Sequence, residues 1–503
     1  MDLKGKRVLI FQQRGWAINI GHFLAKKLQA EGCRLAALTL KNTTHEFILN
    51  QKEVKYDLII SNDEVVSNPK KYLGEDDFSL KEICDSLGVD SVWPLVITIR
   101  NYSKSYKDKY YYGFKQNVSD EVMVDYIKGV YKYIKIFFDK FNPDLIIAPN
   151  IISFPHIAFK LFAEKRGIKM VSVTDSKVRG YYIFSYSQFD DEGLFIDRVD
   201  KLNKGETESS NKERAREYIE EFRKNFIKPE YAVKLSGREP IWQKIRHELS
   251  PYKQSLRWYI KGPSKNYQES TGIVPDYKPP KYILRDHYAE KRYGKFMDNF
   301  NYYDFNKIDK FVYFPLQVQP EATIDVMAPY FNNQIETARQ IALSLPDDYT
   351  LVAKEHPGMV GLRPPSYIEK VARTPNVKLI DYRISSEEVL KRADLIISPN
   401  STTIAEAAFL IKPAIQLGNL GITLKLPNVF KHTDMTTLSD KIKEVLKINL
   451  NNEEYERKLE NFVAAVYDTG FDFKYNTVWT KGKGDDMENL WQLYKGEIER
   501  NIK

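Results

Sequence analysis

The chain has 503 residues, of which 43% are hydrophobic and 29% are charged, and its formal net charge is +8. This length exceeds what one hydrophobic core ordinarily organises, so we predict two packed domains and a connection. The only cysteines, Cys33 and Cys84, exclude a disulfide framework and a cysteine-ligated zinc site, and they make a reducing, cytoplasmic location the expectation.

We expect neither a secretory signal peptide nor a membrane-spanning segment in this sequence. The first residues, "MDLKGKRVLIFQQRGW", lack the apolar core of a signal peptide, and their short hydrophobic run is typical of a strand. The most apolar region, 144–163, is interrupted by Asn150, Pro155, His156 and Lys160, so we do not expect it to span a membrane.

The excess positive charge is concentrated in one segment, between Lys224 and Lys295, where sixteen Lys and Arg face seven Asp and Glu. Such a segment suits phosphate groups, anionic lipid or an acidic polymer. No nucleic-acid-binding signature accompanies it, so we expect no nucleic acid partner. The stretch 241–261 fits an interfacial helix on anionic lipid, but we favour a helix packed over an inter-domain groove because Pro251 would break a long amphipathic stripe.

In chain order, apolar strands alternate with helical periodicity in the first part of the chain, which is typical of a parallel sheet covered on both faces. We expect a Rossmann-like acceptor domain over residues 1–200. The predicted strands are 7–11, 35–40, 57–60, 144–150 and 169–175, and the predicted helices begin near Gly21, Asp120 and Phe154.

The pattern then changes over residues 201–306, which we expect to form a basic helical connection. A second strand–helix alternation predicts a Rossmann-like nucleotide-sugar domain over 307–465, and residues 466–503 predict helices that pack back on the first domain. In the second domain the predicted strands are 311–316, 349–354, 376–380, 394–400 and 413–418, and the predicted helices are 329–345, 385–392 and one from Thr402. The fold class is therefore α/β, with two Rossmann-like domains facing a cleft.

Three strand ends of the second domain carry polar residues. Ligands of open α/β sheets lie beyond the carboxyl ends of the strands, so "PLQVQPEAT", "KEHPG" and "SPNSTTIAEA" predict one donor site. The candidate donor-side residues are Gln317, Gln319, Glu321, Lys354, Glu355, His356, Ser401, Thr402, Thr403 and Glu406, of which Glu321 and His356 are also candidate catalytic residues.

The segment from Ser401 to Thr403 opens a helix, whose unpaired N–H groups and partial positive charge attract phosphate. Ordinary N-capping would explain the same residues. Glu406, one turn further along, could bind a ribose diol or could be an exposed helix residue.

Lys354 and His356 would face the same phosphate. An imidazole can donate one hydrogen bond to a phosphate oxygen, and positive charge offsets the negative charge that develops on a leaving phosphate. Pro357 would end the strand so that His356 projects from the sheet edge. The alternative is a structural pair of His356 and Glu355 in a turn.

These segments resemble the donor half of bacterial capsule and surface-polysaccharide glycosyltransferases of the GT-B fold, in particular the transferases that use CMP-activated 3-deoxy-octulosonate (Kdo). In that family a segment beginning Gln-Val with following acidic residues precedes an HP motif, and a Ser/Thr cluster opens a later helix; Gln317 with Glu321, His356 with Pro357, and 401–403 match. Bacterial sialyltransferases share the HP and Ser/Thr motifs. The family has paired acidic residues where this chain has Gln319-Pro320-Glu321, which leaves the donor sugar open.

The acceptor domain should supply a carboxylate or histidine. Asp175 is the first candidate, because it ends a predicted strand beside Lys177 and Arg179, whose charges would keep it ionised. Arg14 and His22, after the first strand, are candidate acceptor contacts. The segment 190–193, "DDEG", superficially resembles the acidic motif that supplies the sialyltransferase base.

No D-x-D pair and no metal-ligand spacing occurs, so a metal-independent transfer without a cofactor is the prediction. The resemblance implies a nucleotide-sugar donor and a glycan or lipid-linked glycan acceptor. Peripheral contact of the basic segment with an anionic membrane is an open alternative. The rival functions are a CDP-polyol phosphotransferase of the teichoic-acid type, a nucleotide-sugar 2-epimerase and a glycan-binding subunit without enzymatic activity.

Overall fold

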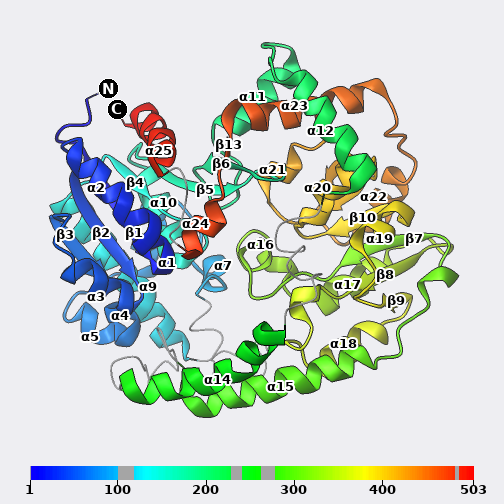
Figure 1. Cartoon of the computed structure of the whole chain (residues 1–503), viewed down its shortest axis with the longest axis horizontal. Coiled ribbons are helices and arrows are strands. Elements are labelled where there is room, and N and C mark those ends of the chain that lie inside the picture. The colour runs from blue at the N-terminus through cyan, green and yellow to red at the C-terminus, as the bar shows by residue number, and fades with distance from the viewer. Residues whose placement is uncertain (1, 100–117, 228–240, 262–277, 482–486, 503) are drawn as a thin grey trace.

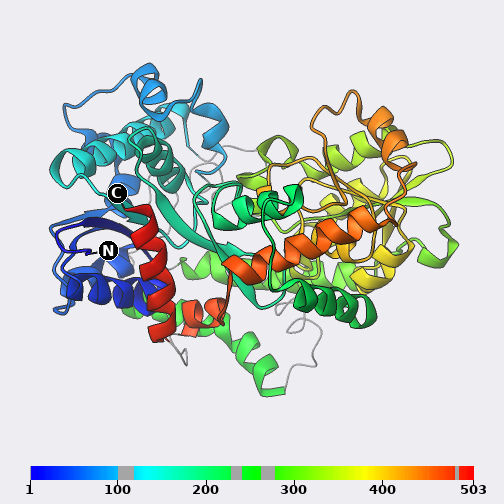
Figure 2. The same cartoon turned by 90° about the horizontal axis from the view of Figure 1, so that it is seen from above.

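A computed structural model describes the chain except for residues 1, 100–117, 228–240, 262–277, 482–486 and 503. The described residues form two α/β domains, which lie side by side in Figures 1 and 2. This confirms the predicted fold class of two Rossmann-like domains. Parts of the basic segment, 228–240 and 262–277, lie outside the described residues.

The first domain contains a seven-stranded sheet in the order β13-β6-β5-β4-β1-β2-β3. Its strands are β1 (Arg7–Gln13), β2 (Arg34–Leu40), β3 (Leu58–Ser61), β4 (Leu145–Ile147), β5 (Met170–Asp175), β6 (Tyr181–Ser185) and β13 (Phe471–Asp472). The first five are parallel to one another, whereas β6 and β13 are antiparallel additions that the sequence did not predict.

Helices cover both faces of this sheet, because alternate residues of β1 are buried on opposite sides, Leu9 and Phe11 in one hydrophobic cluster and Val8 and Ile10 in another. The helices of the first domain are α1 (Arg14–Trp16), the π-helix η1 (Ala17–Gly21), α2 (His22–Ala30), α3 (Asn42–Asn50), α4 (Asn62–Ser67), α5 (Pro69–Leu73), α6 (Leu80–Leu87), α7 (Trp93–Val96), α9 (Asp120–Lys140) and α10 (Phe154–Glu164).

The second domain contains a six-stranded parallel sheet in the order β12-β11-β10-β7-β8-β9. Its strands are β7 (Phe311–Pro315), β8 (Thr350–Lys354), β9 (Val377–Ile380), β10 (Leu395–Ser398), β11 (Ala414–Gln416) and β12 (Val429–Lys431). In chain order this is the doubly wound arrangement, with the topological switch between β7 and β10.

Helices between and after these strands complete the second domain. They are α16 (Ala322–Asp325), η4 (Pro329–Phe331), α17 (Gln334–Leu343), η5 (Pro357–Met359), α18 (Pro365–Ala372), α19 (Ser386–Arg392), α20 (Thr402–Phe409), α21 (Gly421–Leu424), α22 (Leu438–Val445) and α23 (Glu453–Thr469). The helix predicted over 329–345 is thus two elements, η4 and α17.

The connection is helical, with α11 (Leu194–Lys204), α12 (Lys212–Asn225), α14 (Ile241–Lys261), α15 (Pro280–Asp298) and η3 (Phe305–Lys307). The helices α14 and α15 run along each other at the lower edge of the molecule in Figure 1. After α23 the chain returns to the first domain through α24 (Tyr475–Lys481) and α25 (Met487–Asn501), which contribute to the cluster on the β1–β4 sheet. None of the described helices combines the length and apolar composition that crossing a bilayer requires.

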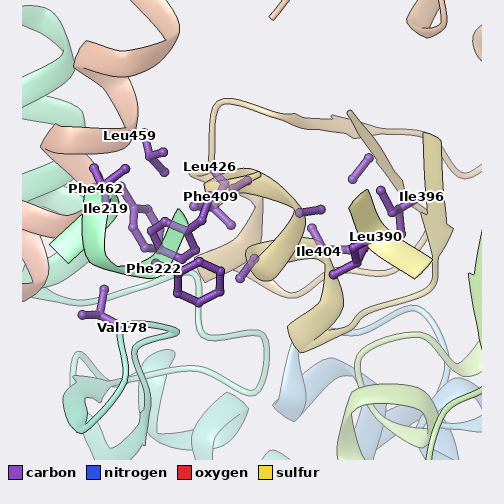
Figure 3. Packing of buried hydrophobic residues seen from close by; sticks show 14 of the residues in the cluster. Val178, Ile219, Phe222, Leu390, Ile396, Ile404, Phe409, Leu426, Leu459 and Phe462 are labelled. Carbon is purple, nitrogen blue, oxygen red and sulfur yellow. The ribbon is translucent and has the colours of Figure 1, made fainter. Parts of the chain in front are cut away.

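One hydrophobic cluster crosses the boundary between the two halves. Val178, after β5, is buried in the same cluster as Phe222 of α12, Phe409 of α20 and Phe462 of α23 (Figure 3). The helices α11 and α12 therefore pack against α23 and the second domain. This shared core fixes the end of β5 close to α20, which carries part of the predicted donor site.

Candidate functional site

Three neighbouring strands bring the donor-side segments together. In the second sheet β7 lies between β10 and β8, so the residues after all three strands emerge at one edge. The edge includes the switch point between β7 and β10, where ligands of doubly wound sheets bind.

Lys354 is the last residue of β8, and its side chain is buried, with 4% of the residue exposed. Its ammonium group makes no hydrogen bond or ion pair with any of the described residues. Burial lowers the pKa of Lys354 to about 8, although Glu406, Glu355 and Asp381 act in the opposite direction. A buried cation without a direct partner is costly, and an anionic ligand would offset that cost.

His356 follows two residues later and caps η5. Its Nδ1 accepts a hydrogen bond from the N–H of Gly358 at 3.0 Å, so the neutral ring carries its proton on Nε2. Burial, with the nearby charges of Lys354 and Arg363, lowers the pKa of His356 to about 4. At neutral pH the ring is an uncharged hydrogen-bond donor through Nε2–H.

Glu355 lies between these two residues and belongs to the framework. Nη1 of Arg363 donates to both of its carboxylate oxygens, at 2.7 and 2.9 Å, and each of the two side chains is 1% exposed. The N–H of His356 also donates to Oε1 at 2.7 Å. This corrects the expectation that Glu355 binds the donor, because its oxygens already accept these bonds. The sequence offered no motif that identifies Arg363.

The three residues from Ser401 to Thr403 have two different roles. Ser401 caps α20, since its Oγ accepts the N–H of Thr403 at 3.0 Å. The capping alternative therefore describes Ser401. The side chains of Thr402 and Thr403 are half-buried and make no hydrogen bond within the described part of the chain, so their hydroxyl groups can serve a ligand at this helix end.

Glu406, one turn into α20, is buried and paired across the domain boundary. Nη2 of Arg179 lies 2.7 Å from its Oε1. Burial raises the pKa of Glu406, and the charges of Arg179 and Lys354 oppose that rise. This corrects the alternative of an exposed helix residue, because Glu406 is buried. One carboxylate oxygen holds Arg179, and the contact with a ribose diol stays a prediction.

Asp175 ends β5 on the other side of this boundary, and 54% of its side chain is exposed. The N–H of Lys177 donates to its Oδ1 at 2.8 Å, and Nζ of Lys177 lies 3.3 Å from the same oxygen. Desolvation raises its pKa, but Lys177 and Arg179 outweigh that effect, so the pKa of Asp175 is lowered. The positive charge of Arg179 thus lowers the pKa of both Asp175 and Glu406, and the carboxylate of Glu406 raises the pKa of Lys354. These charges link the two domains.

The two glutamines of the loop after β7 make hydrogen bonds within the second domain. The Nε2 of Gln317 donates to Pro315 O at 2.7 Å and to Ser398 Oγ at 3.3 Å, which joins β7 to β10. The amide of Gln319 bonds Asn332 O at 2.8 Å and Gln334 Nε2 at 3.0 Å. Both side chains are buried. This corrects the expectation that they contact the donor directly: they hold the loop after β7 in place.

Glu321 precedes α16 and is exposed, and its Oε2 accepts a hydrogen bond from Thr323 at 3.0 Å. The segment is anchored by Asn400, whose Nδ2 donates to Thr323 O at 2.8 Å. On its other side Val326 is buried in the hydrophobic cluster of the first domain. Glu321 is therefore held at the boundary between the domains, and its catalytic role stays a prediction.

The two acceptor candidates after β1 lie in different environments. Arg14 is exposed directly after the carboxyl end of β1. His22, however, is buried on α2, with Nε2 2.8 Å from Glu53 Oε2 and its ring edge-on to Phe47. This corrects the expectation that His22 contacts the acceptor. The π-helix η1 separates His22 from the carboxyl end of β1, and its partner Glu53 precedes the amino end of β3.

The first domain holds a buried histidine that the sequence did not single out as functional. His156, in the first turn of α10, stacks on Phe11 of β1, and Ser153 Oγ lies 2.6 Å from its Nδ1. Its Nε2 is buried and makes no hydrogen bond with the described residues. Burial lowers the pKa of His156 to about 3, so the ring is neutral. It lies beside the β1–β4 switch point of this sheet.

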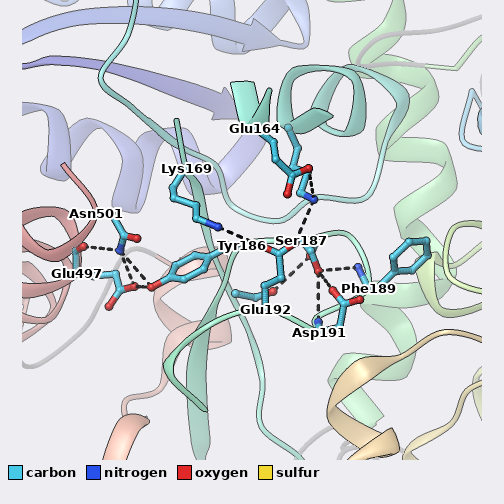
Figure 4. Close-up of polar contacts among 11 residues, drawn as sticks. Glu164, Lys169, Tyr186, Ser187, Phe189, Asp191, Glu192, Glu497 and Asn501 are labelled. Carbon is cyan, nitrogen blue, oxygen red and sulfur yellow. Dashed lines mark hydrogen bonds and ion pairs between the residues drawn. The ribbon is translucent and has the colours of Figure 1, made fainter. Parts of the chain in front are cut away.

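The acidic segment 190–193 is engaged by the first domain itself (Figure 4). Asp190 is buried and accepts a hydrogen bond from Thr174 at 3.0 Å, and burial raises its pKa. Asp191 accepts one from Ser187, and Glu192 lies between two lysines, Lys160 and Lys169, each at 3.2 Å. These contacts hold the segment in place, and its resemblance to a catalytic base motif stays an untested hypothesis.

Among the residues that the structure describes, no group of three or more His, Cys, Asp or Glu side chains is placed to hold a metal ion.

Comparison with known proteins gives remote structural matches. No family model and no curated protein matches the sequence. Among solved structures, the chain is similar to the β-Kdo 2,7 transferase of KpsC from Thermosulfurimonas dismutans, with 12% identity over 73% of this chain and 89% of that chain and a TM-score of 0.35. The calicheamicin glycosyltransferase CalG4 matches with 13% identity over 98% and 99% of the chains and a TM-score of 0.28. A UDP-GlcNAc 2-epimerase from Neisseria meningitidis matches with 12% identity over 92% and 99% and a TM-score of 0.26. Scores this low establish neither a common fold nor an activity, so the description as two Rossmann-like domains rests on the strand orders.

Proposed function

We propose that this chain is a glycosyltransferase of surface-polysaccharide synthesis, which holds a nucleotide-sugar on its second domain and a glycan acceptor on its first. One observation carries the proposal: Lys354 is a buried cation that makes no hydrogen bond or ion pair with the described residues, at the carboxyl edge of a doubly wound sheet. A phosphate group is the ligand that such a position favours.

The surrounding groups fit the same anion. His356 donates through Nε2–H without adding charge, and Thr402 and Thr403 offer hydroxyl and N–H groups at the start of α20. When the bond between sugar and phosphate breaks, negative charge develops on the leaving phosphate. The ammonium group of Lys354 and the dipole of α20 would stabilise it, because both are held in place before the reaction.

Asp175 is the proposed catalytic carboxylate. Its lowered pKa keeps it ionised at neutral pH, which suits a nucleophile, or a charge that stabilises a cationic sugar, better than a base tuned near neutrality. Arg179 supports this role, since it acts on the pKa of Asp175 and also ties β5 to α20 through Glu406. Glu321, held at the domain boundary, is the second candidate.

The donor that we propose is a CMP-linked acidic sugar such as Kdo, on the strength of the resemblance of the three donor segments. The acceptor is a glycan or a lipid-linked glycan, for which Arg14 is the proposed contact on the first domain. We further propose that the transfer needs no metal ion or cofactor and takes place in the cytoplasm.

The test is a transfer assay with CMP-Kdo and a glycan acceptor, following CMP release and the glycosylated product. We expect His356→Ala and Thr402→Ala each to reduce turnover while the circular dichroism spectrum is unchanged. Near-wild-type rates in both variants would reject the site. Thermal-shift titration with CMP-, CDP-, UDP- and GDP-linked compounds first identifies the nucleotide.

The same assay separates the rival functions. Turnover of a nucleotide-sugar without any acceptor would identify a 2-epimerase. A phosphodiester in the ³¹P NMR spectrum of the product would identify a polyol phosphotransferase, since a glycosyltransferase leaves no phosphorus in the new linkage. Absence of nucleotide binding would leave a glycan-binding subunit.

A further inference from the structure

The helix α14 carries a continuous row of large exposed apolar side chains, which we call the apolar stripe. Each of its members is between 48% and 78% exposed. The stripe consists of Ile241, Trp242, Ile245, Leu249, Tyr252, Leu256, Tyr259 and Ile260.

The spacing of the apolar stripe places it on one face of the helix. At 3.6 residues per turn, the eight positions fall within an arc of about 100°. Pro251 lies outside that arc and is buried. The helix continues through Pro251, which corrects the expectation that this residue would interrupt an amphipathic stripe.

The opposite face of α14 packs on α15. A polar cavity between the two helices is lined by Ser250, Pro251 and Gln254 of α14 and by Asp286 and His287 of α15, among others. The helix α15 thus takes the polar face and leaves most of the apolar stripe exposed. Tyr252 lies where the stripe meets α15, with its hydroxyl group 2.8 Å from that of Tyr288. This also corrects the expectation that the apolar side chains cover a groove between the domains.

A row of cations runs beside the apolar stripe. Arg246, Lys253 and Arg257 are exposed and fall within a further arc of about 40° on one flank of it. Arg246 and Lys253 make no ion pair within the described residues. Glu248 is the only acidic residue of α14, and it is paired with Lys291 of α15. Arg246 and Lys253 therefore leave positive charge on this flank that no acidic side chain of the described residues pairs with.

We infer that α14 is a membrane-docking helix, which lies in the head-group region of a bilayer rich in anionic lipid. The apolar stripe would enter the acyl boundary, and Arg246, Lys253 and Arg257 would contact the lipid phosphates. Trp242, Tyr252 and Tyr259 are the residue types that prefer this boundary. A bilayer fits the observations better than a protein partner, because a long apolar stripe flanked by exposed cations complements an extended anionic surface.

The position of the helix in the molecule supports this contact. The helices α14 and α15 form the lower edge of the structure in Figure 1, and the side chains of the apolar stripe are exposed. At the same time α15 touches the segment just after η5, where a Cβ on Gly361 would lie 2.8 Å from Glu290 O. A docked α14 would therefore hold the second domain close to the lipid surface. The inference does not depend on the proposed transferase activity.

Co-sedimentation of the full chain with vesicles tests it. One set of vesicles contains equal parts of phosphatidylcholine and phosphatidylglycerol, and the other contains phosphatidylcholine alone. The first variant combines Trp242→Ser, Leu249→Ser and Leu256→Ser, and the second combines Arg246→Gln, Lys253→Gln and Arg257→Gln. The matched control combines Ile18→Ser, Leu49→Ser and Leu343→Ser, which are comparably exposed apolar residues on other surfaces.

We expect the wild type and the control to bind the anionic vesicles, and each α14 variant to lose affinity by about tenfold or more. Binding should also fall steeply with added salt. Absence of wild-type binding, equal binding of all variants, or an equal loss in the control would overturn the inference. A wild type that is dimeric by light scattering and becomes monomeric only in the first variant would assign the stripe to self-association instead, and would likewise overturn it.

Discussion

Replacing Lys354 by methionine should weaken donor binding and at the same time make the protein without ligand more stable. Both effects have one cause, the burial of a cation that makes no hydrogen bond or ion pair with the described residues. Methionine keeps the length and apolar volume of the lysine stem but carries no charge. A lysine whose role is purely structural would behave in the opposite way.

The magnitude follows from the pKa of Lys354, which is lowered from 10.5 to about 8. That shift corresponds to roughly 3 kcal/mol of preference for the neutral amine in the folded protein. At pH 7 the amine is protonated in the folded and the unfolded chain, so the folded state bears this cost in full. Removing the charge releases up to roughly 3 kcal/mol, which should raise the Tm by several degrees.

Donor binding changes in the other direction. A hydrogen bond to a charged group contributes about 1.5 to 3 kcal/mol, so the affinity for CMP should fall by about tenfold to a hundredfold. Thermal unfolding without ligand measures the first effect, and isothermal titration with CMP measures the second.

Lys431→Met is the matched control. The pKa of Lys431 is also lowered to about 8 by burial, but its ammonium group donates to Gly418 O and to Asn419 Oδ1, the latter at 2.7 Å. The lowered pKa of Lys431 implies a similar cost for its charge, but its removal also leaves the oxygen atoms without their donor, so this control should gain less stability than Lys354→Met. If Lys354→Met gained no more stability than the control, or bound CMP as the wild type does, the reasoning about Lys354 would be refuted.

Three further predictions concern the chemistry. Asp175→Asn should lower kcat by about a hundredfold or more while the Kd for CMP stays unchanged, and near-wild-type turnover would remove Asp175 from the mechanism. The kcat/KM for the donor should fall as the pH rises above about 8, because Lys354 then loses its proton, whereas His356, with a pKa of about 4, adds no inflection between pH 6 and 7. Lys354→Arg should move that fall to higher pH, and an unchanged profile would assign it to another group. Transfer should persist in excess EDTA, and a loss that only Mg²⁺ or Mn²⁺ restores would contradict metal independence.

The sequence predicted the parallel strands well, because buried parallel strands are continuous apolar runs that turn residues and helices separate. It missed β6 and β13, which are short antiparallel additions at one edge and carry no such run. The position of Lys354 and His356 at a strand end followed directly from the end of an apolar run at Pro357.

Partners of the site residues could not be predicted in the same way. Arg363 binds Glu355 from eight residues away without any periodic pattern, and Arg179 reaches Glu406 across 227 positions of the chain. His22 was misplaced because nothing in the sequence marks the π-helical turn that precedes it. The exposure of the apolar stripe likewise depends on which face of α14 meets α15, which only the packed structure shows.

A crystal structure with bound CMP tests the central claim most directly. The account predicts the phosphate at the carboxyl edge of the second sheet, within hydrogen-bond distance of Lys354 Nζ, His356 Nε2 and the first turn of α20. A phosphate bound elsewhere, with Lys354 still lacking a direct partner, would contradict it.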